Sequence, residues 1–394
     1  MLTLKILFWA CLLIVFYTYL GYGILLYIII RLKRLFAGSP REAAVPADDE
    51  LPTMTLMICA YNEEDVVAEK MENTRAIDYP KDKLRIMWVT DGSNDRTNEL
   101  LGTYPEVDIV FSPERKGKTA ALKHGLRELQ TRYVAFTDAN TMINPGALRE
   151  IARLFCDPTV GCVSGEKRVA ARKAGEMAAE GEGLYWKYES TLKRWDSELY
   201  SAMGAAGELY AIDPSLCREV PDEALLDDFM MSMYVVQGGK RIAYTPDAYA
   251  MEYGSANIYE ESKRKRRIAA GGLQSIWWLR SMLNPLRQPL VTFQYVSHRV
   301  LRWSITPIAM VLLLLVNIAL VALGAGTCYT VTFILQVLFY LMALAGWLLN
   351  RYGYKNKLLY TAYYFVFMNL NIFRGMAYLK SHGRSGAWEK AKRS

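Results

Sequence analysis

Residues 133–141 read Tyr-Val-Ala-Phe-Thr-Asp-Ala-Asn-Thr, a short apolar segment that stops on an acid and an amide. The apolar run predicts a buried β-strand, and the carboxyl end of such a strand is where an open α/β sheet builds its ligand site. Asp138 and Asn140 carry oxygen donors with one residue between them, so both can face a single divalent cation. An ordinary strand-to-loop turn explains the same pair, because Asp and Asn both favour turns. The rest of the chain decides between the two interpretations.

Upstream of this stretch, short apolar runs alternate with helical stretches. We predict strands at residues 54–60, 84–90, 107–111, 133–137 and 161–169, and helices at about 119–129 and 174–199. Strand and helix alternating at this spacing predict an α/β fold, in which helices cover both faces of a parallel sheet. The long helix carries several Tyr and Trp residues, which we expect to pack against the sheet.

The first four predicted strands all end on polar side chains: Asn62, Asp91, the pair Lys116 and Lys118, and Asp138. The carboxyl ends of parallel strands meet at one edge of a sheet, so these groups should line one crevice. Carboxylates, an amide and lysines favour a nucleotide with a metal-bound diphosphate. No Gly-x-Gly-x-x-Gly follows the first strand and there is no Walker sequence, which argues against a dinucleotide oxidoreductase or a P-loop ATPase.

Three later motifs have two interpretations each. Gly204 and Gly207 stand before a strand, where they permit a close backbone approach to a ligand or simply make a turn. Asp227 and Asp228 open a helix, where carboxylates cap the helix or, if partly buried, serve as a proton acceptor. The basic run 263–267 suits a membrane surface, and it also suits a diphosphate leaving group.

Long uncharged segments lie at both ends of the chain. Residues 6–30 form one, long enough for a membrane anchor, and we predict two further spans at about 303–323 and 328–349. Residues 358–373 are a short or tilted span, or lie in the interface. Basic residues 31–34 follow the anchor and predict that the middle of the chain lies in the cytoplasm.

Composition argues against a nucleic-acid-binding protein, a disulfide-stabilised protein and a zinc enzyme. The net charge of +7 is concentrated beside the membrane segments and near the carboxyl terminus, which favours anionic lipid headgroups over nucleic acid. The 6 cysteines and 3 histidines are scattered, without the spacing of a disulfide framework or a zinc site.

Taken in order, these motifs resemble the family-2 glycosyltransferases. The match is closest to the membrane-embedded, often processive members, such as the synthases of poly-N-acetylglucosamine, chitin, hyaluronan and cellulose. The resemblance implies a GT-A fold (a Rossmann-like nucleotide-diphospho-sugar transferase domain), a UDP-sugar donor and Mg²⁺ or Mn²⁺. It implies a glycan or lipid-linked acceptor and a plasma membrane location, the inner membrane in bacteria. It leaves open whether the protein has accessory subunits or forms an oligomer.

The expected organisation is a membrane anchor at 1–35, a linker at 36–53, a cytoplasmic GT-A domain at 54–270, interfacial helices at 271–302, a membrane region at 303–380 and a basic tail at 381–394. The resemblance also implies roles for individual residues: Tyr61, Asn62 and Glu64 at the uridine; Asp91 and Lys118 at the nucleotide; Asp138 and Asn140 at the metal; Asp228 as catalytic base, preceded by Asp227; and Arg267 at the diphosphate.

The chain departs from the family pattern at three positions. Asn140 stands where a second metal-binding acid is usual, and Arg264 and Ile268 replace the Gln and Trp of the Gln-x-x-Arg-Trp motif. The resemblance as a whole implies a membrane-bound inverting glycosyltransferase that extends a polysaccharide, with Asp228 as base. The alternatives are an enzyme that adds one sugar to a lipid-linked acceptor, and a non-catalytic partner subunit.

Overall fold

The computed structural model describes residues 1–38, 43–170, 177–253, 258–354 and 356–382. The predicted basic tail at 381–394 therefore lies almost entirely outside the described residues, as does part of the predicted linker.

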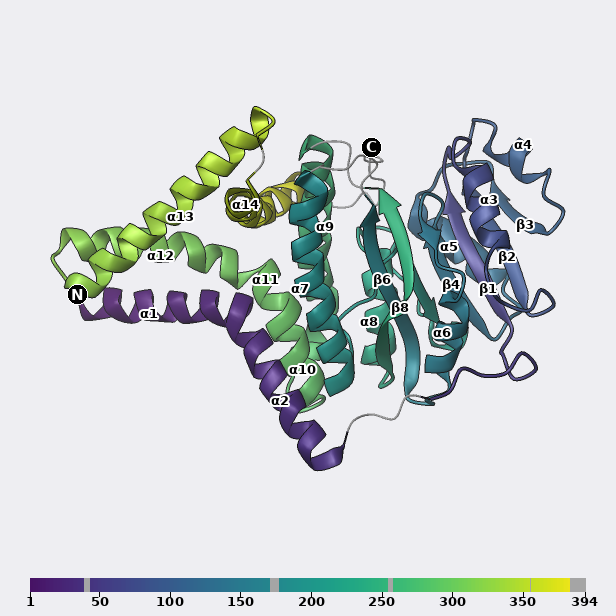
Figure 1. Cartoon of the computed structure of the whole chain (residues 1–394), viewed down its shortest axis with the longest axis horizontal. Coiled ribbons are helices and arrows are strands. Elements are labelled where there is room, and N and C mark those ends of the chain that lie inside the picture. Colours follow the sequence, from purple (N-terminus) through teal and green to yellow (C-terminus); the bar gives the residue numbers. More distant parts are fainter. Residues whose placement is uncertain (39–42, 171–176, 254–257, 355, 383–394) are drawn as a thin grey trace.

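A mixed sheet forms the centre of the large domain (Figure 1). Its eight strands stand in the order β3-β2-β1-β4-β7-β6-β8-β5. Strands β1 to β4 run parallel, β7 is antiparallel to both β4 and β6, and β8 is parallel to β6. The bounds are β1 Met54–Ala60, β2 Leu84–Asp91, β3 Val107–Ser112, β4 Tyr133–Asp138, β5 Met142–Ile143, β6 Val160–Ala170, β7 Leu209–Ile212 and β8 Arg241–Tyr253. The five predicted strands are confirmed to within one residue at each end.

Burial on both faces of the sheet explains why the inner strands read as apolar runs. On β1, Met57 packs into one hydrophobic cluster, while its neighbours Leu56 and Ile58 pack into another. The first cluster includes side chains of α5 and α8, and the second includes side chains of α3 and α6. The domain helices are α3 Val67–Arg75, α4 Thr97–Leu101, α5 Lys118–Arg127, α6 Ala147–Phe155, α7 Met177–Leu199, α8 Asp227–Gln237 and α9 Ile258–Trp278.

Three helices in the described part of the chain are long and apolar enough to cross a membrane. They are Leu2–Ala37, Ile305–Ala322 (α12) and Thr327–Arg351 (α13), in agreement with the three predicted spans. The first consists of α1 Leu2–Phe16, a π-helical turn at Tyr17–Gly21 and α2 Tyr22–Ala37. In Figure 1, α1, α12 and α13 extend away from the sheet on one side of the molecule. The predicted fourth segment is part of a longer helix, α14 Lys357–His382, which packs on α9 and α13.

The long helix α7 separates the sheet from α2, and the expectation that its aromatic side chains pack on the sheet is wrong for two of them. Tyr188 and Trp195 pack in a cluster with Tyr22 and Leu26 of α2. The Tyr188 hydroxyl also donates to the backbone carbonyl of Tyr19, at 2.6 Å. An amphipathic helix buries its aromatic face against whichever apolar partner is available, and here that partner is α2, the second half of the first membrane-length helix.

The segment expected to lie in the interface, 271–302, contains the end of α9, a 3₁₀ turn Arg280–Leu283, α10 Pro289–Tyr295, a π-helical turn Val296–Val300 and the start of α11 Leu301–Trp303. Helix α9 runs unbroken through residue 270, the expected end of the domain. Much of the second half of the segment is buried inside the protein, which the interface prediction did not anticipate.

A buried polar network occupies that second half. His298 Nδ1 lies 2.5 Å from Asp196 Oδ2, and its Nε2 lies 3.1 Å from Glu189 Oε1. Arg302 bonds the other oxygen of Glu189 at 2.9 Å, and the Tyr22 hydroxyl donates to Asp196. The network joins α2, α7 and the chain before α12, so it fixes the sheet domain against the membrane helices.

Candidate functional site

The carboxyl ends of β1, β2 and β4 meet at one edge of the sheet, as the sequence predicts. The register pairs Cys59 with Asp138, at the ends of β1 and β4, and Asp91 ends the neighbouring strand β2. Burial raises the pKa of the Cys59 thiol to about 12, while Lys118 opposes the shift and the carboxylates of Asp227 and Asp138 add to it. The thiol therefore lies among charged groups that come from four elements of the domain.

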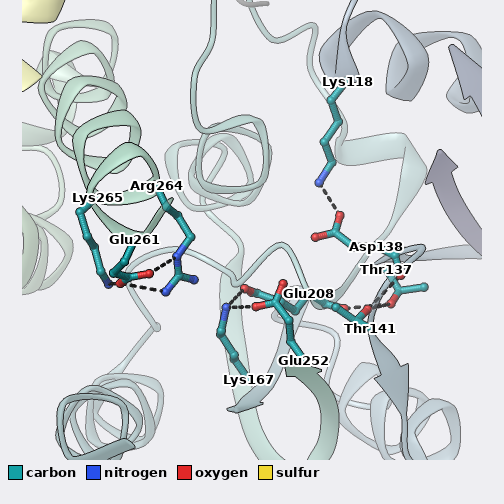
Figure 2. Close-up of polar contacts among 10 residues, drawn as sticks. All are labelled: Lys118, Thr137, Asp138, Thr141, Lys167, Glu208, Glu252, Glu261, Arg264 and Lys265. Atoms are coloured by element: carbon teal, nitrogen blue, oxygen red, sulfur yellow. Dashed lines mark hydrogen bonds and ion pairs between the residues drawn. The ribbon is translucent and has the colours of Figure 1, made fainter. Parts of the chain in front are cut away.

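Lys118 is the group that links these carboxylates. Its Nζ donates to Asp138 Oδ1 at 2.7 Å (Figure 2). Loss of hydration lowers the pKa of an ammonium group, but the charges of Asp138 and Asp227 outweigh it and hold the pKa of Lys118 above its usual range. A lysine that is charged and already paired with a carboxylate can transfer its contact to a phosphate.

The loop that carries the lysines is held by Asp91. Its two carboxylate oxygens accept hydrogen bonds from the backbone N–H groups of Lys116 and Gly117, at 2.9 and 2.6 Å. The neighbouring Arg115 lies over the Tyr61 ring, with its guanidinium carbon 3.9 Å from the ring centroid. The loop after β3 is therefore fastened to the ends of both β1 and β2.

Asn62 and Glu64 lie after β1, and both bond residues of the loop after β2. Asn62 has a positive φ of 53°, a conformation that Asn tolerates better than most residues. Its side-chain amide donates to Asn94 Oδ1 at 2.7 Å and accepts from the Asn94 backbone N–H at 3.0 Å. Glu64 Oε2 accepts from the backbone N–H of Arg96 at 2.9 Å. Both side chains join the loops after β1 and β2, and their contact with a nucleotide stays a prediction.

Asp227 and Asp228 begin helix α8, and both are half-buried. Asp228 Oδ1 accepts from the backbone N–H of Phe229 at 2.8 Å, in the first turn of the helix. Burial and the adjacent Asp227 raise the pKa of Asp228 to about 6, although Lys118 acts in the opposite direction. Its other oxygen faces Gly207, where an added Cβ would lie only 2.7 Å from Oδ2. The same carboxyl thus accepts a hydrogen bond from an N–H group of the first helical turn and has a raised pKa.

Few side chains at this edge of the sheet could coordinate a metal ion. No three His, Cys, Asp or Glu side chains gather as a metal-binding group among the residues that the structure describes. Asn140 is half-buried and makes no hydrogen bond within this part of the chain. Mg²⁺ typically keeps several waters and takes one or two carboxylates together with substrate phosphates. Asp138 with Asn140 therefore fits a metal that shares its coordination with a diphosphate.

The structure does not join Arg267 to this crevice. Its Nε is buried without a hydrogen-bond partner in the described residues, and no ion pair there links it to the strand ends. Arg264, one turn earlier on α9, bonds Glu261 at 3.1 and 3.2 Å, and Lys265 lies 3.4 Å from the same carboxylate. The basic run is thus partly buried and paired within α9.

Sequence reasoning missed a buried charge cluster beside the crevice. Lys167 of β6 bonds both Glu208 and Glu252, and Figure 2 places this trio between the Lys118–Asp138 pair and Arg264. Burial opposes the ionisation of Glu208, but Lys167 outweighs it and holds the pKa of that carboxyl well below its usual range. Only the two glycines before the strand hinted that the loop of Glu208 mattered.

A second missed group is Lys70 of α3, which is completely buried behind β4. Its Nζ donates to Thr137 Oγ1 at 3.2 Å and to the Thr141 carbonyl at 2.5 Å, and so holds the turn that carries Asp138. Burial lowers the pKa of Lys70 to about 7. No sequence pattern points to this residue, because a single lysine in an amphipathic helix usually faces solvent.

Comparison with known proteins gives a family and two kinds of relative. The family model described as "Glycosyl transferase family 2" matches residues 55–213. A beta-monoglucosyldiacylglycerol synthase of Synechocystis sp. is 25% identical over 259 residues, which cover 61% of this chain and 53% of that protein. A poly-beta-1,6-N-acetyl-D-glucosamine synthase of Staphylococcus aureus is 27% identical over 232 residues, covering 57% and 55%. The chain thus spans about half the length of the curated relatives it matches.

Among solved structures, the chain is similar to the mannosyltransferase PcManGT from Pyrobaculum calidifontis, in complex with GDP-Man and Mn²⁺. The TM-score is 0.67 at 22% identity, and the match covers 96% of this chain and 99% of that one. At this identity the likeness concerns the fold alone. The expected GT-A architecture flanked by apolar, membrane-length helices is confirmed.

Proposed function

Because residues 55–213 form a family-2 glycosyltransferase domain, we propose that this protein is a membrane-bound inverting glycosyltransferase that extends a polysaccharide from a UDP-sugar. The observation that carries the proposal is the Asp228 carboxyl, whose pKa is raised to about 6 and on which the charge of Lys118 acts. Lys118 also bonds Asp138 at 2.7 Å. A carboxyl with a raised pKa and a lysine that bonds Asp138 thus interact at one edge of the sheet, which supports the roles of proton acceptor and phosphate-binding cation that we propose for them.

In the proposed reaction, Asp228 takes the proton of an acceptor hydroxyl as its oxygen attacks the anomeric carbon of the donor. The bond to the UDP oxygen breaks on the opposite face, so an α-linked donor yields a β-linked product. Lys118 turns from Asp138 to the leaving diphosphate and stabilises its growing charge. Asp91 holds the loop that positions this lysine. We propose that Arg267 also contacts the diphosphate.

Asp138 and Asn140 would hold Mg²⁺ or Mn²⁺. When bound, the metal supplies Lewis-acid stabilisation of the diphosphate charge. The replacement of a second acid by Asn140 leaves a neutral oxygen donor, so we expect weaker metal affinity than a two-carboxylate site would give.

The test is to incubate membranes that contain the full chain with labelled UDP-sugars and GDP-mannose, each with Mg²⁺ or Mn²⁺, and to size the product. Polymer supports the proposal. The Asp228→Asn variant should lose transfer while it keeps UDP binding, because the amide preserves the shape of the side chain but cannot accept the proton. Retained turnover in that variant would exclude Asp228 as the base.

A second candidate function is the addition of one sugar to a lipid acceptor. The relative named as a glycolipid synthase supports it, since it aligns over as much of this chain as the polysaccharide synthase does. A single labelled product that partitions into organic solvent would favour this candidate over polymer synthesis.

A further inference from the structure

A second polar site lies at the membrane end of the domain, away from the strand ends. The first helix runs from Leu2 to Ala37 over 36 residues. At 1.5 Å per residue it is about 54 Å long, whereas the hydrocarbon core of a bilayer is about 30 Å thick. Its π-helical turn at Tyr17–Gly21 separates two halves with different partners: α1 packs along the membrane helix α12, and α2 packs along α7. Figure 1 shows α2 diverging from α1 at this turn.

Since α1 and the turn already amount to the thickness of the hydrocarbon core, α2 belongs at the membrane surface. Its exposed side chains agree with that position. Ile28, Leu35 and Phe36 are 47%, 78% and 89% exposed, and Arg31, Lys33 and Arg34 stand among them. Apolar and basic residues interleaved in this way are typical of a helix that lies in the headgroup region of a bilayer.

Helices α2 and α7 run side by side in the same direction and flank a half-open cavity of about 330 Å³ near their carboxyl ends. The cavity is lined by Tyr27, Ile30, Arg31, Arg34, Arg194 and Trp195. Three arginines, a tyrosine and a tryptophan thus contribute to the lining of one space. None of these lining residues lies at the strand ends where we propose that the nucleotide-sugar binds.

Positive charge in this cavity exceeds what its neighbours neutralise. Arg34 forms a two-pronged ion pair with Glu198, with both contacts at 2.6 Å. Arg31 Nε donates only to the neutral Tyr27 hydroxyl, at 2.9 Å. Arg194 is exposed and makes no hydrogen bond or ion pair with any residue in the described ranges. Two guanidinium groups are therefore left without a carboxylate in the described part of the chain, at the mouth of a cavity.

We propose that this cavity binds the phosphate of an anionic phospholipid headgroup. Guanidinium groups bind phosphate through paired, charge-assisted hydrogen bonds, and Tyr and Trp rings are favoured at the headgroup level. The exposed apolar side chains of α2 would lie against the acyl chains of the same lipid. Because α7 also contacts the sheet, a lipid held here fixes the catalytic domain at one height above the membrane.

Free inorganic phosphate shares this chemistry, so the experiment has to separate the two sources. The full chain is purified in detergent and titrated with a fluorescent, short-chain phosphatidylglycerol, with fluorescence anisotropy as the readout. Phosphatidylcholine with the same chains and inorganic phosphate serve as competitors. The test variant is Arg31→Gln with Arg194→Gln, and Arg34 is kept because its removal would break the pair with Glu198. The matched control is Arg351→Gln, an exposed arginine whose guanidinium carbon lies 5.9 Å from the ring centroid of Trp347.

The expected result is that phosphatidylglycerol binds the wild type and the control equally, and the double variant at least about tenfold more weakly. A normal melting temperature of the double variant shows that its folding is intact, as expected for two arginines that form no ion pair within the described residues. Equal binding to the double variant and the wild type would overturn the proposal. So would equal competition by phosphatidylcholine, or displacement of the lipid by millimolar inorganic phosphate, which would assign the cavity to free phosphate.

Discussion

Replacement of Gly207 by Ala should move the proposed base without unfolding the domain. A Cβ at this position would lie 2.7 Å from Asp228 Oδ2 and 3.3 Å from its Cγ, whereas ordinary contact begins at 3.4 Å. The carboxylate therefore has to retreat by about 0.7 Å. A displacement of about 1 Å at a reacting group costs on the order of 100-fold in rate, so we expect kcat to fall by roughly 10- to 100-fold.

The assay is the initial rate of sugar transfer at saturating donor, together with the affinity for UDP and the melting temperature. The matched control is Gly146→Ala, because an added Cβ there meets no atom within 4 Å. We expect Gly207→Ala to keep its UDP affinity, since the crowded atoms belong to the base and not to the nucleotide loops. An unchanged kcat, or a loss of UDP affinity as large as the loss of kcat, would refute this reasoning.

Three further predictions concern pH, the lysine loop and the buried network. With the pKa of Asp228 raised to about 6, kcat/KM should fall tenfold per pH unit below about 6 and level off above it, as a pH-rate profile measures. The same carboxyl binds more protons in the folded chain than in the unfolded chain between about pH 4 and 6, so its contribution to stability declines as the pH rises through that range. Asp91→Ala frees two backbone N–H groups and should weaken UDP binding about tenfold, as measured by calorimetry, while unaltered affinity would contradict the role of the loop. His298→Ala removes one hydrogen-bond partner from each of two buried carboxylates that keep their other partners, and should reduce stability by about 1–3 kcal/mol; an unshifted melting curve in detergent would count against it.

Much of the domain and its crevice could be predicted from the sequence. Strands β1, β2 and β4 contain runs of buried apolar residues, β3 is a partly exposed strand at the edge of the sheet, and each of the four is followed by a polar group. Because parallel strands place their carboxyl ends at one edge, Asp91, Lys118 and Asp138 converge whatever the details of packing. The membrane helices are equally local signals, since a bilayer of fixed thickness requires an uncharged run of fixed length.

The sequence misled where contacts join distant parts of the chain. The pattern of α7 predicts aromatic side chains on the sheet, yet Tyr188 and Trp195 pack on α2, more than 150 residues earlier. Residues 271–302 are expected to be interfacial helices, yet His298 within them is fully buried between Asp196 and Glu189. An amphipathic pattern reports that a helix has an apolar face, but it does not report which surface covers that face.

By itself, then, the sequence determined the strands of the nucleotide half, the polar groups at its edge and the membrane-length helices, because each depends on residues that are neighbours in the chain. Only the tertiary structure decided that Gly207 faces Asp228, that Lys118 links the carboxylates, and that arginines of α2 and α7 share one cavity. These arrangements depend on how separate helices and strands pack together. Local sequence patterns do not distinguish among the many ways in which those elements could pair.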